Sequence, residues 1–232
     1  MKLKICHYSF GIIASIAVIV FLLITAFEIG AYSDYGWFEK EYAKYEVLDD
    51  LEMKMKDVMH VTEEMMAFLR GNRTDLVVDT VVDGEEREFF NDREKAHMVD
   101  VKNLFVGGLW VRRIAILLFM VAVISLIITK ADWKRLLPKS FLIGLGVFVG
   151  VTTGMGLLFL SDFNKYFTMF HELFFDNDLW LLDPRTDLLI RMLPEGFFMD
   201  MVIRIGLIFI ALLLIGVVIS IVALHVQRNK KN

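Results

Sequence analysis

The sequence is poor in the residues that crosslink or break a chain. Cys6 is the only cysteine among 232 residues, which excludes an internal disulfide framework and any metal site built from several cysteines. Proline occurs three times, and the motifs G-x-S-x-G, H-E-x-x-H, Walker and Rossmann are absent. The formal net charge of −4 and the lack of a basic stripe with interleaved aromatics argue against a general nucleic-acid binder.

Apolar residues form 56% of the chain and gather in long blocks, apart from the charged 23%. This separation excludes a disordered chain and disfavours a simple soluble globule. A bilayer core needs roughly 20 mostly apolar residues in helical form. Four runs meet that need: Phe10–Phe27, Ile114–Thr129, Phe141–Leu160 and Met201–Leu224. We therefore predict a single membrane domain, 1–232, with spans at about 10–29, 109–129, 141–160 and 201–224.

The first run has an alternative interpretation as a cleaved signal peptide, because Lys2 and Lys4 supply a basic start. However, the run is longer than a usual signal core, and Glu28 interrupts the small-residue pattern at which cleavage occurs. We expect it to remain as a span. Cys6 precedes the run, so it is not a lipobox cysteine and is expected to be a cytosolic thiol.

Basic residues predict which way the four spans face. They gather in the N-terminus, in the connection between spans two and three, and in the C-terminus: Lys2, Lys4, Lys130, Lys134, Arg135, Lys139, Arg228, Lys230 and Lys231. These three segments share one side in a four-span chain, so both termini should be cytoplasmic. The acid-rich connections 33–111 and 161–200 should then be extracytoplasmic.

Small and charged residues in the spans each allow two interpretations. Gly146, Gly150 and Gly154 share a helix face, which favours a packing seam between helices, with a slot for an acyl chain as the alternative. Glu28 and Arg204 lie near the outer ends of their spans. We expect them either to pair with each other or to contact a lipid headgroup.

The first outer connection has the pattern of a small α+β cap. Glu39–Arg70 lacks glycine and proline and has apolar residues near a helical period, which predicts one long helix ending at Gly71. Leu76–Val82 and Glu85–Phe90 indicate strands joined by the turn Asp83-Gly84. The predicted fold class is an all-α integral membrane protein, with four transmembrane helices and a small extracytoplasmic α+β cap containing a β-hairpin.

Further helices are expected around the two outer connections. Asn91 followed by Glu94 resembles a capping box, which opens a helix that should reach a break at Gly107-Gly108. Aromatic residues in the second connection recur at helical spacing, as is typical of a helix lying in the membrane interface: Phe163, Tyr166, Phe167, Phe170 and Phe174. Thr186–Leu193 should form a short helix stopped by Pro194, so that all three prolines fall in connections.

Two histidines of the outer connections, His97 and His171, are candidates for acid–base chemistry, because imidazole takes and gives protons near neutral pH. Glu94, Asp100 and Glu172 are the neighbouring carboxylates that could orient the rings. One alternative is a surface or packing role for each histidine. Another is a metal site of Glu94, His97 and Asp100, which share a helix face but lack the second matching motif that such sites need.

Two longer patterns resemble one bacterial membrane-protein family. The first comprises Phe170-His171-Glu172-Leu173-Phe174-Phe175, Asn177, Trp180, Leu182-Asp183-Pro184, Asp187, Leu193-Pro194 and Phe197-Phe198. The second comprises Leu69-Arg70-Gly71, Arg93-Glu94, His97-Met98 and Asp100-Val101. On these residues, and over nearly its whole length, the chain resembles the bacterial lipoprotein intramolecular transacylases, four-span membrane proteins formerly of unknown function.

The resemblance implies an acyl transfer within one substrate molecule. The sn-2 acyl chain of a diacylated lipoprotein would move to the amine of its N-terminal cysteine, giving the lyso-form, among membrane lipids and without an added cofactor. His97 and His171 would be the acid–base pair, and Arg93, Asn177 or Arg191 would position the ester or its oxyanion. The alternative from another class is a non-enzymatic scaffold or sensor whose outer cap binds a partner.

Overall fold

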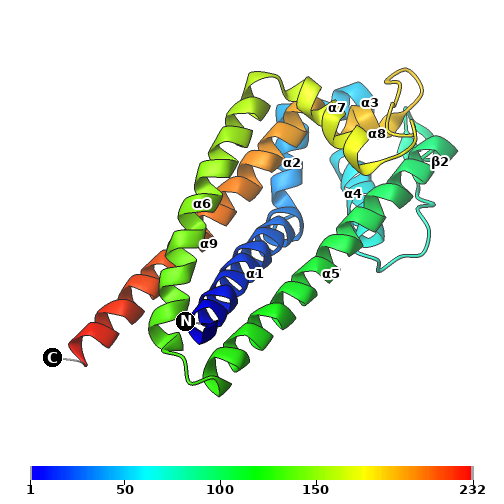
Figure 1. Cartoon of the computed structure of the whole chain (residues 1–232). Helices are drawn as coiled ribbons and strands as arrows, with labels where there is room; N and C mark the ends of the chain where they lie inside the picture. Colours follow the sequence, from blue (N-terminus) through cyan, green and yellow to red (C-terminus); the bar gives the residue numbers. More distant parts are fainter. Residues whose placement is uncertain (1, 231–232) are drawn as a thin grey trace. The chain divides into compact units, whose positions relative to one another are not determined.

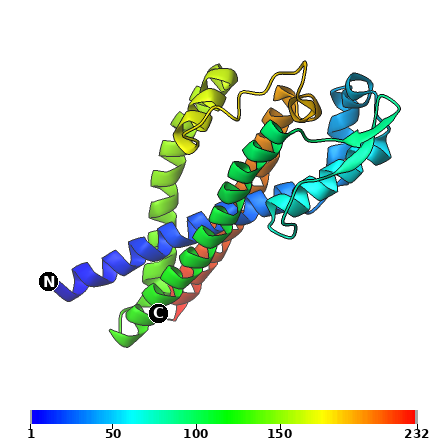
Figure 2. The same ribbon diagram turned by 90° about the vertical axis from the view of Figure 1, so that its right-hand side faces the viewer.

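The computed structural model describes the backbone of residues 2–230, and the side chains of all of these except 2–4, 155–161 and 163. The chain forms two compact units (Figures 1 and 2). Unit 1 consists of Met1–Ile29, Leu109–Asp162 and Ile205–Asn232, and unit 2 consists of Gly30–Gly108 and Phe163–Arg204. The side chains of Lys2, Lys4, Phe163 and Lys231, for which roles were expected, lie outside the described residues.

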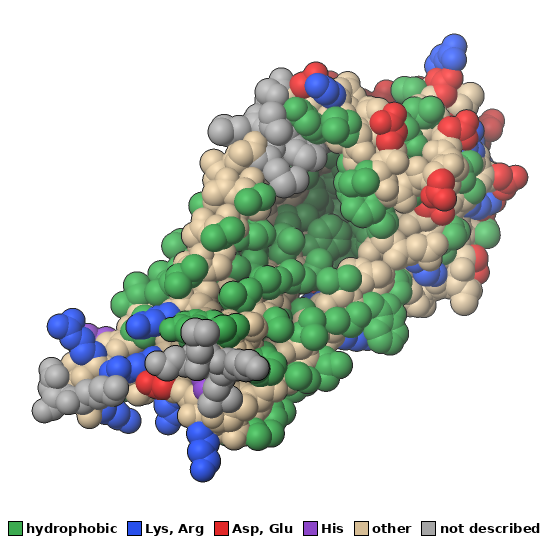
Figure 3. Space-filling view, in the orientation of Figure 1, with side chains coloured by type: hydrophobic (Ala, Val, Ile, Leu, Met, Phe, Trp, Pro, Cys, Tyr) green, Lys and Arg blue, Asp and Glu red, His purple; other side chains and the backbone are tan. Residues whose placement is uncertain are grey.

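Four long helices carry the apolar runs, as predicted. They are α1 (Lys2–Tyr32), α5 (Asp92–Ile128), α6 (Trp133–Ser161) and α9 (Glu195–Asn229). Each contains a stretch long and apolar enough to cross a membrane. Figure 3 shows hydrophobic side chains gathered along these helices, and Ile143 and Leu207 are 71% and 63% exposed. Because water does not tolerate so large an apolar surface, these helices belong in a lipid bilayer.

The core of unit 1 joins three of the long helices in one buried cluster: Ile19 and Ala26 of α1, Phe141 of α6, and Phe209 and Leu213 of α9. Helices α1 and α6 approach closely at two glycines. A Cβ atom at Gly144 would lie 3.2 Å from the Cβ of Ser15, and one at Gly11 would lie 3.3 Å from the Cβ of Ser140. Side chains at these two positions would push the helices apart.

The packing seam expected on Gly146, Gly150 and Gly154 is not formed. A Cβ atom at any of the three would have no atom within 4 Å among the described residues. The prediction named the right helix and the wrong face, because spacing shows which residues share a face but not which face meets a neighbour.

Two other boundaries differ from expectation. Helix α6 begins at Trp133, so Pro138 lies inside a helix and not in a connection. Pro138 is close enough to the start that its missing N–H affects only the first turns. Helix α5 continues through Gly107-Gly108 without the expected break. Each glycine costs about 1 kcal/mol of helix stability relative to alanine, which the long apolar stretch after it offsets.

Glu28 and Arg204, the charged residues near the ends of the long helices, each have a partner within their own unit. The carboxylate of Glu28 forms an ion pair with Arg112 of α5. Arg204 lies 3.9 Å from Asp34, and its guanidinium stacks 4.8 Å from the centre of the Trp37 ring. Each pairing lowers the cost of holding a charge near lipid.

Unit 2 begins with three helices that each bury one side in its core: α2 (Gly36–Lys44), α3 (Val47–Leu51) and α4 (Met55–Leu69). The single long helix predicted over Glu39–Arg70 is wrong. Glu46 and Glu52 adopt left-handed backbone angles, with φ of 54° and 52°, and so flank α3. The end at Gly71 is confirmed: its φ is 86°, and its N–H bonds to the carbonyl of Phe68 at 2.9 Å.

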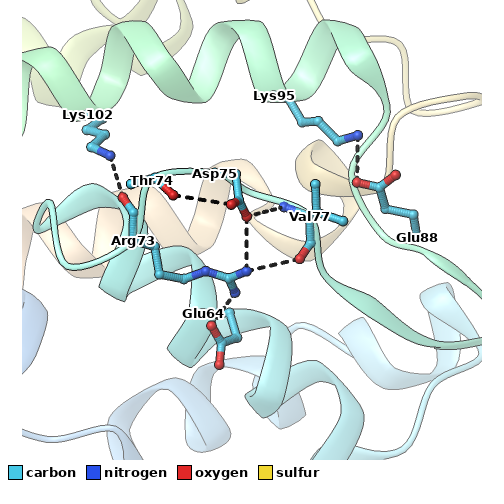
Figure 4. Close-up of polar contacts among 8 residues, drawn as sticks. All are labelled: Glu64, Arg73, Thr74, Asp75, Val77, Glu88, Lys95 and Lys102. Carbon is cyan, nitrogen blue, oxygen red and sulfur yellow. Dashed lines mark hydrogen bonds and ion pairs between the residues drawn. The ribbon is translucent and has the colours of Figure 1, made fainter.

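The β-hairpin is confirmed. Strand β1 (Asp79–Val82) pairs antiparallel with β2 (Glu85–Glu88). Asp83 and Gly84 form the turn, with φ of 52° and 75°, which is the pattern of a type I′ turn. Figure 4 shows the ion pairs that fasten this region to its neighbours.

Helix α5 is fastened to the hairpin and to the loop before it (Figure 4). Arg73 forms an ion pair with Glu64 of α4, and Lys102 of α5 donates to the carbonyl of Arg73 at 2.6 Å. Lys95 of α5 pairs with Glu88 of β2 at 2.5 Å. These contacts hold the first turns of α5 firmly within unit 2.

The second outer connection contains two helices. Helix α7 (Phe163–Phe174) confirms the helix predicted from the aromatic spacing. Helix α8 (Leu188–Met192) is shorter than the predicted Thr186–Leu193, because Asp187 before it is extended, with ψ of 116°.

Candidate functional site

His97 is placed by the start of α5. The capping box is formed as predicted: Glu94 N–H donates to Oδ1 of Asn91 at 3.0 Å, and Asn91 N–H donates to Oε2 of Glu94 at 2.7 Å. One turn later, His97 is only 8% exposed. Among the described residues, its Nδ1 is buried and has no hydrogen-bond partner.

Glu94 is fully buried and ties α8 to α5. Its Oε1 accepts a hydrogen bond from the N–H of Leu189 at 2.6 Å, and Asn91 Nδ2 donates to Asp187 at 2.7 Å. Burial raises the pKa of the Glu94 carboxyl, and the bonds from backbone N–H groups oppose that rise. Glu94, one of the three carboxylates that could have oriented a histidine ring, is thus occupied by backbone N–H groups.

His171 projects from α7 into an aromatic enclosure and is 7% exposed. Its ring centre lies 4.2 Å from that of Phe167, 4.9 Å from that of Trp180 and 5.5 Å from that of Phe175. Nδ1 lies 2.7 Å from the carbonyl oxygen of Phe167. A carbonyl only accepts, so Nδ1 carries the proton and Nε2 of the neutral ring is free to accept one.

The two histidines come from different helices and meet in unit 2. Their ring centres are 6.1 Å apart, and the ring of Phe175 packs against both, 5.6 Å from that of His97. In the sequence, His97 comes before the apolar stretch of α5, and His171 comes after that of α6. Burial lowers the pKa of His97 to about 4, helped by the nearby His171, and burial also lowers the pKa of His171. Both rings are therefore neutral at pH 7 and able to take a proton.

Asp100 and Asn177 lie together beside this pair. Asn177 Nδ2 donates to Oδ2 of Asp100 at 2.9 Å. Both line a cavity of about 240 Å³, whose wall also includes Phe175, the ring that contacts both histidines. The site thus has an acidic cavity next to two neutral imidazoles.

The other expected site residues have separate partners. Arg93 donates to the backbone carbonyl of Asp178 and contributes to lowering the pKa of His97. Arg191 bonds to Asp50 at 2.9 Å, which joins α8 to α3. Glu172 is exposed on α7.

The alternative metal site is not formed by the residues that the structure describes. In that part of the chain, no group of three or more His, Cys, Asp or Glu side chains is arranged to hold a metal ion. Glu94 instead binds backbone N–H groups, as described above.

Three contributors to the site were not identified as such from the sequence: the carbonyl of Phe167, the ring of Phe175 and the ring of Trp180. Phe167 and Phe175 stand four residues before and after His171. Helical spacing points to contacts at these distances, although α7 itself ends at Phe174. No sequence pattern indicates the contact of Trp180 with His171.

Comparisons with known proteins agree with this architecture. A family model described as lipoprotein intramolecular transacylase Lit matches residues 12–198. The solved structure of the membrane-integral lipoprotein intramolecular transacylase Lit from Bacillus cereus has a TM-score of 0.78 at 21% identity, covering 96% of this chain and 97% of that one. A second structure of that protein, with a histidine replaced by alanine, gives a TM-score of 0.75 at 20% identity over 96% and 95%. No curated protein sequence gives a significant match.

Proposed function

The chain belongs to the lipoprotein intramolecular transacylase family, and on that basis we propose that it moves the sn-2 acyl chain of a diacylglyceryl lipoprotein to the amine of the N-terminal cysteine. The product is the lyso-form lipoprotein. As a family member the chain is an acyltransferase and a multi-pass membrane protein. Its substrate partner in this proposal is a diacylated lipoprotein in a lipid bilayer.

The observation that carries the proposal is the meeting of His97 and His171, 6.1 Å apart, in an aromatic enclosure. Aminolysis of an ester needs a base for the attacking ammonium and an acid for the departing oxygen. The bond from His171 to Phe167 leaves Nε2 of His171 as the acceptor, which favours this ring as the base. His97 is then the partner that passes a proton to the leaving group.

The steps balance without an added reagent. His171 removes a proton from the cysteine ammonium, and the freed amine forms a C–N bond to the ester carbonyl carbon. The tetrahedral intermediate collapses by breaking its C–O bond to glycerol, and His97 relays a proton from the new amide nitrogen to the glyceryl oxygen. The proton that His171 took is released to water, which returns both imidazoles to the neutral form. Because amine and ester arrive in one molecule, orientation alone can supply several kcal/mol, up to roughly 7–11.

Stabilisation of the oxyanion is assigned to a nearby positive group. Arg93 is assigned this role because it is the only positive group among the expected orienting residues near the start of α5, one turn before His97. Asn177 acts through Asp100 in this proposal, and Glu94 holds the start of α5 in place. Arg191 and Glu172, which contact Asp50 and solvent, have subsidiary roles.

We assign both termini to the cytoplasm, and segments 33–111 and 161–200 with the site to the extracytoplasmic side. In unit 1, basic side chains gather at the end where α5 turns into α6 and where the C-terminal helix ends (blue in Figure 3). Basic residues favour the cytoplasmic side. The spans at about 10–29, 109–129, 141–160 and 201–224 then carry the chain across four times.

The experiment is a conversion assay with the full chain in lipid vesicles. A synthetic diacylglyceryl lipopeptide with a free amine is incubated, and the product is read by tandem mass spectrometry. The transfer leaves the total mass unchanged, so the diagnostic signals are an N-acylated cysteine fragment and loss of reactivity toward an amine label. A scaffold or sensor would leave the lipopeptide unaltered, and that result would overturn the proposed function.

A further inference from the structure

The acidic cavity beside the histidines has no part in the acid–base steps. Its volume is about 240 Å³, and its polar lining is Asp100, Asn103, Asp176 and Asn177. None of the lining residues is basic, and within the described residues neither aspartate forms an ion pair. Leu104, Phe174 and Phe175 complete the lining, so the cavity combines two carboxylates with an apolar wall. Two carboxylates without a basic partner favour a cation as the ligand.

Asp100 is held in position for such a contact. Asn177 Nδ2 occupies Oδ2 of Asp100 at 2.9 Å, which leaves the other carboxylate oxygen for a ligand. Asn177 is itself fixed, because its Oδ1 accepts from the N–H of Leu179 at 3.1 Å and its carbonyl accepts from Nε1 of Trp180 at 3.0 Å. The same Trp180 ring packs against His171.

The ring of Phe175 separates the cavity from the histidine pair. Phe175 lines the cavity and packs against His97, which is 8% exposed and whose Nδ1 has no partner among the described residues. Asp100 follows His97 by three residues, so both lie on the same side of α5. A cation held by Asp100 would therefore sit next to groups that are ready to accept a proton.

We propose that this cavity binds the α-ammonium of the substrate's N-terminal cysteine, with Asp100 as its counter-ion and Asn177 as the positioning residue. This inference rests on the proposed function and adds the residue that recognises the reacting amine. The neutral imidazoles can accept a hydrogen bond from an ammonium but carry no negative charge, so Asp100 supplies the charge that attracts it. After transfer the nitrogen is a neutral amide, so the product loses this contact and is released more readily than the substrate is.

The test measures binding instead of conversion, using the full chain with His97→Ala to stop turnover. Two lipopeptide probes differ only at the amine, which is free in one and acetylated in the other. We expect the free-amine probe to bind about ten- to a hundredfold more tightly, as is typical when a charged hydrogen-bonded pair is formed. Asp100→Asn should bring that ratio close to one, and Asn177→Ala should lower it partly.

Controls separate the possible failures. Asp92→Asn makes the same change on α5 at a fully exposed carboxylate, and it should keep the full ratio. If the His97→Ala chain with Asp100 intact binds both probes equally, the inference is overturned. This result does not depend on whether the Asp100→Asn variant folds. Loss of the ratio on adding a metal chelator would show a metal ion in the cavity and would also overturn it. If the unmodified chain fails to convert lipopeptide, the proposed function fails, irrespective of these ratios.

Discussion

Nδ1 of His171 donates a hydrogen bond to the carbonyl oxygen of Phe167, 2.7 Å away and one turn earlier in α7. This bond fixes the ring tautomer and leaves Nε2 as the nitrogen that can accept a proton. No comparable bond fixes His97 among the described residues. The two histidines therefore differ in environment, and the difference favours different roles.

Replacing either histidine by alanine should lower conversion of the lipopeptide by about 10²–10⁴-fold, the range for a positioned acid or base. The matched control is His60→Ala, because His60 also belongs to unit 2 but is exposed. Initial rates in vesicles, with equal protein incorporation, make the comparison. Unreduced rates in both site variants would rule out histidine catalysis.

The acid limb of the pH–rate profile should lie below the ordinary histidine pKa of about 6.5. Burial lowers the pKa of His171, so the ring stays neutral and active as a base at pH values where an exposed histidine is protonated. Activity should fall only when pH drops through this lowered value. The measurement is kcat/KM across the acid range.

Trp180→Ala tests the cause of that shift, because Trp180 covers one face of His171. Opening this face to water should raise the pKa of His171 and move the acid limb to higher pH. An unmoved limb, with activity retained, would show that burial by Trp180 does not tune the base.

Glu94→Gln should destabilise the fold by about 2 kcal/mol, because an amide group would replace one oxygen of a buried carboxylate that accepts two backbone N–H bonds. Thermal unfolding in one detergent would show this as a lower Tm. Glu86→Gln, an exposed site on β2, is the control and should leave Tm unchanged. Equal Tm values for both variants would contradict the capping role of Glu94.

Gly144→Leu should weaken the packing of α1 against α6 by about 1–3 kcal/mol, the usual cost of overpacking. Its Cβ would already crowd Ser15. Gly150→Leu is the matched control on the same helix, where a Cβ meets open space. The Tm should fall for Gly144→Leu and not for Gly150→Leu. The reverse result would support the packing seam first expected on Gly146, Gly150 and Gly154.

Local chemistry explains which parts of the fold were predictable. The Asp83-Gly84 turn and the Asn91–Glu94 capping box are set by neighbouring residues, and both form as expected. The breaks at Glu46 and Glu52 were not predictable, because glutamate gives no sign of a left-handed conformation and tertiary packing imposes it. The Glu28–Arg112 pair joins α1 to α5 and likewise depends on which helices meet.

The sequence singles out the two histidines as candidates, but it does not predict that they meet. His97 and His171 stood out because imidazole is the usual acid–base group near neutral pH. The bond between Asp100 and Asn177 joins positions 77 residues apart, and no spacing rule reaches that far. The hydrogen bond from the N–H of Leu189 to Glu94 is likewise too distant in sequence to predict, and it engages a carboxylate that was a candidate to orient a histidine ring.

The capped start of α5 carries His97 in the same helix turns that hold unit 2 together. Glu94 binds the backbone of Leu189, and Lys95 and Lys102 fasten these turns to the hairpin and to the loop before it. A change that loosens any of these contacts will therefore also displace the imidazole. A displacement of about 1 Å is enough to slow an oriented reaction by roughly a hundredfold.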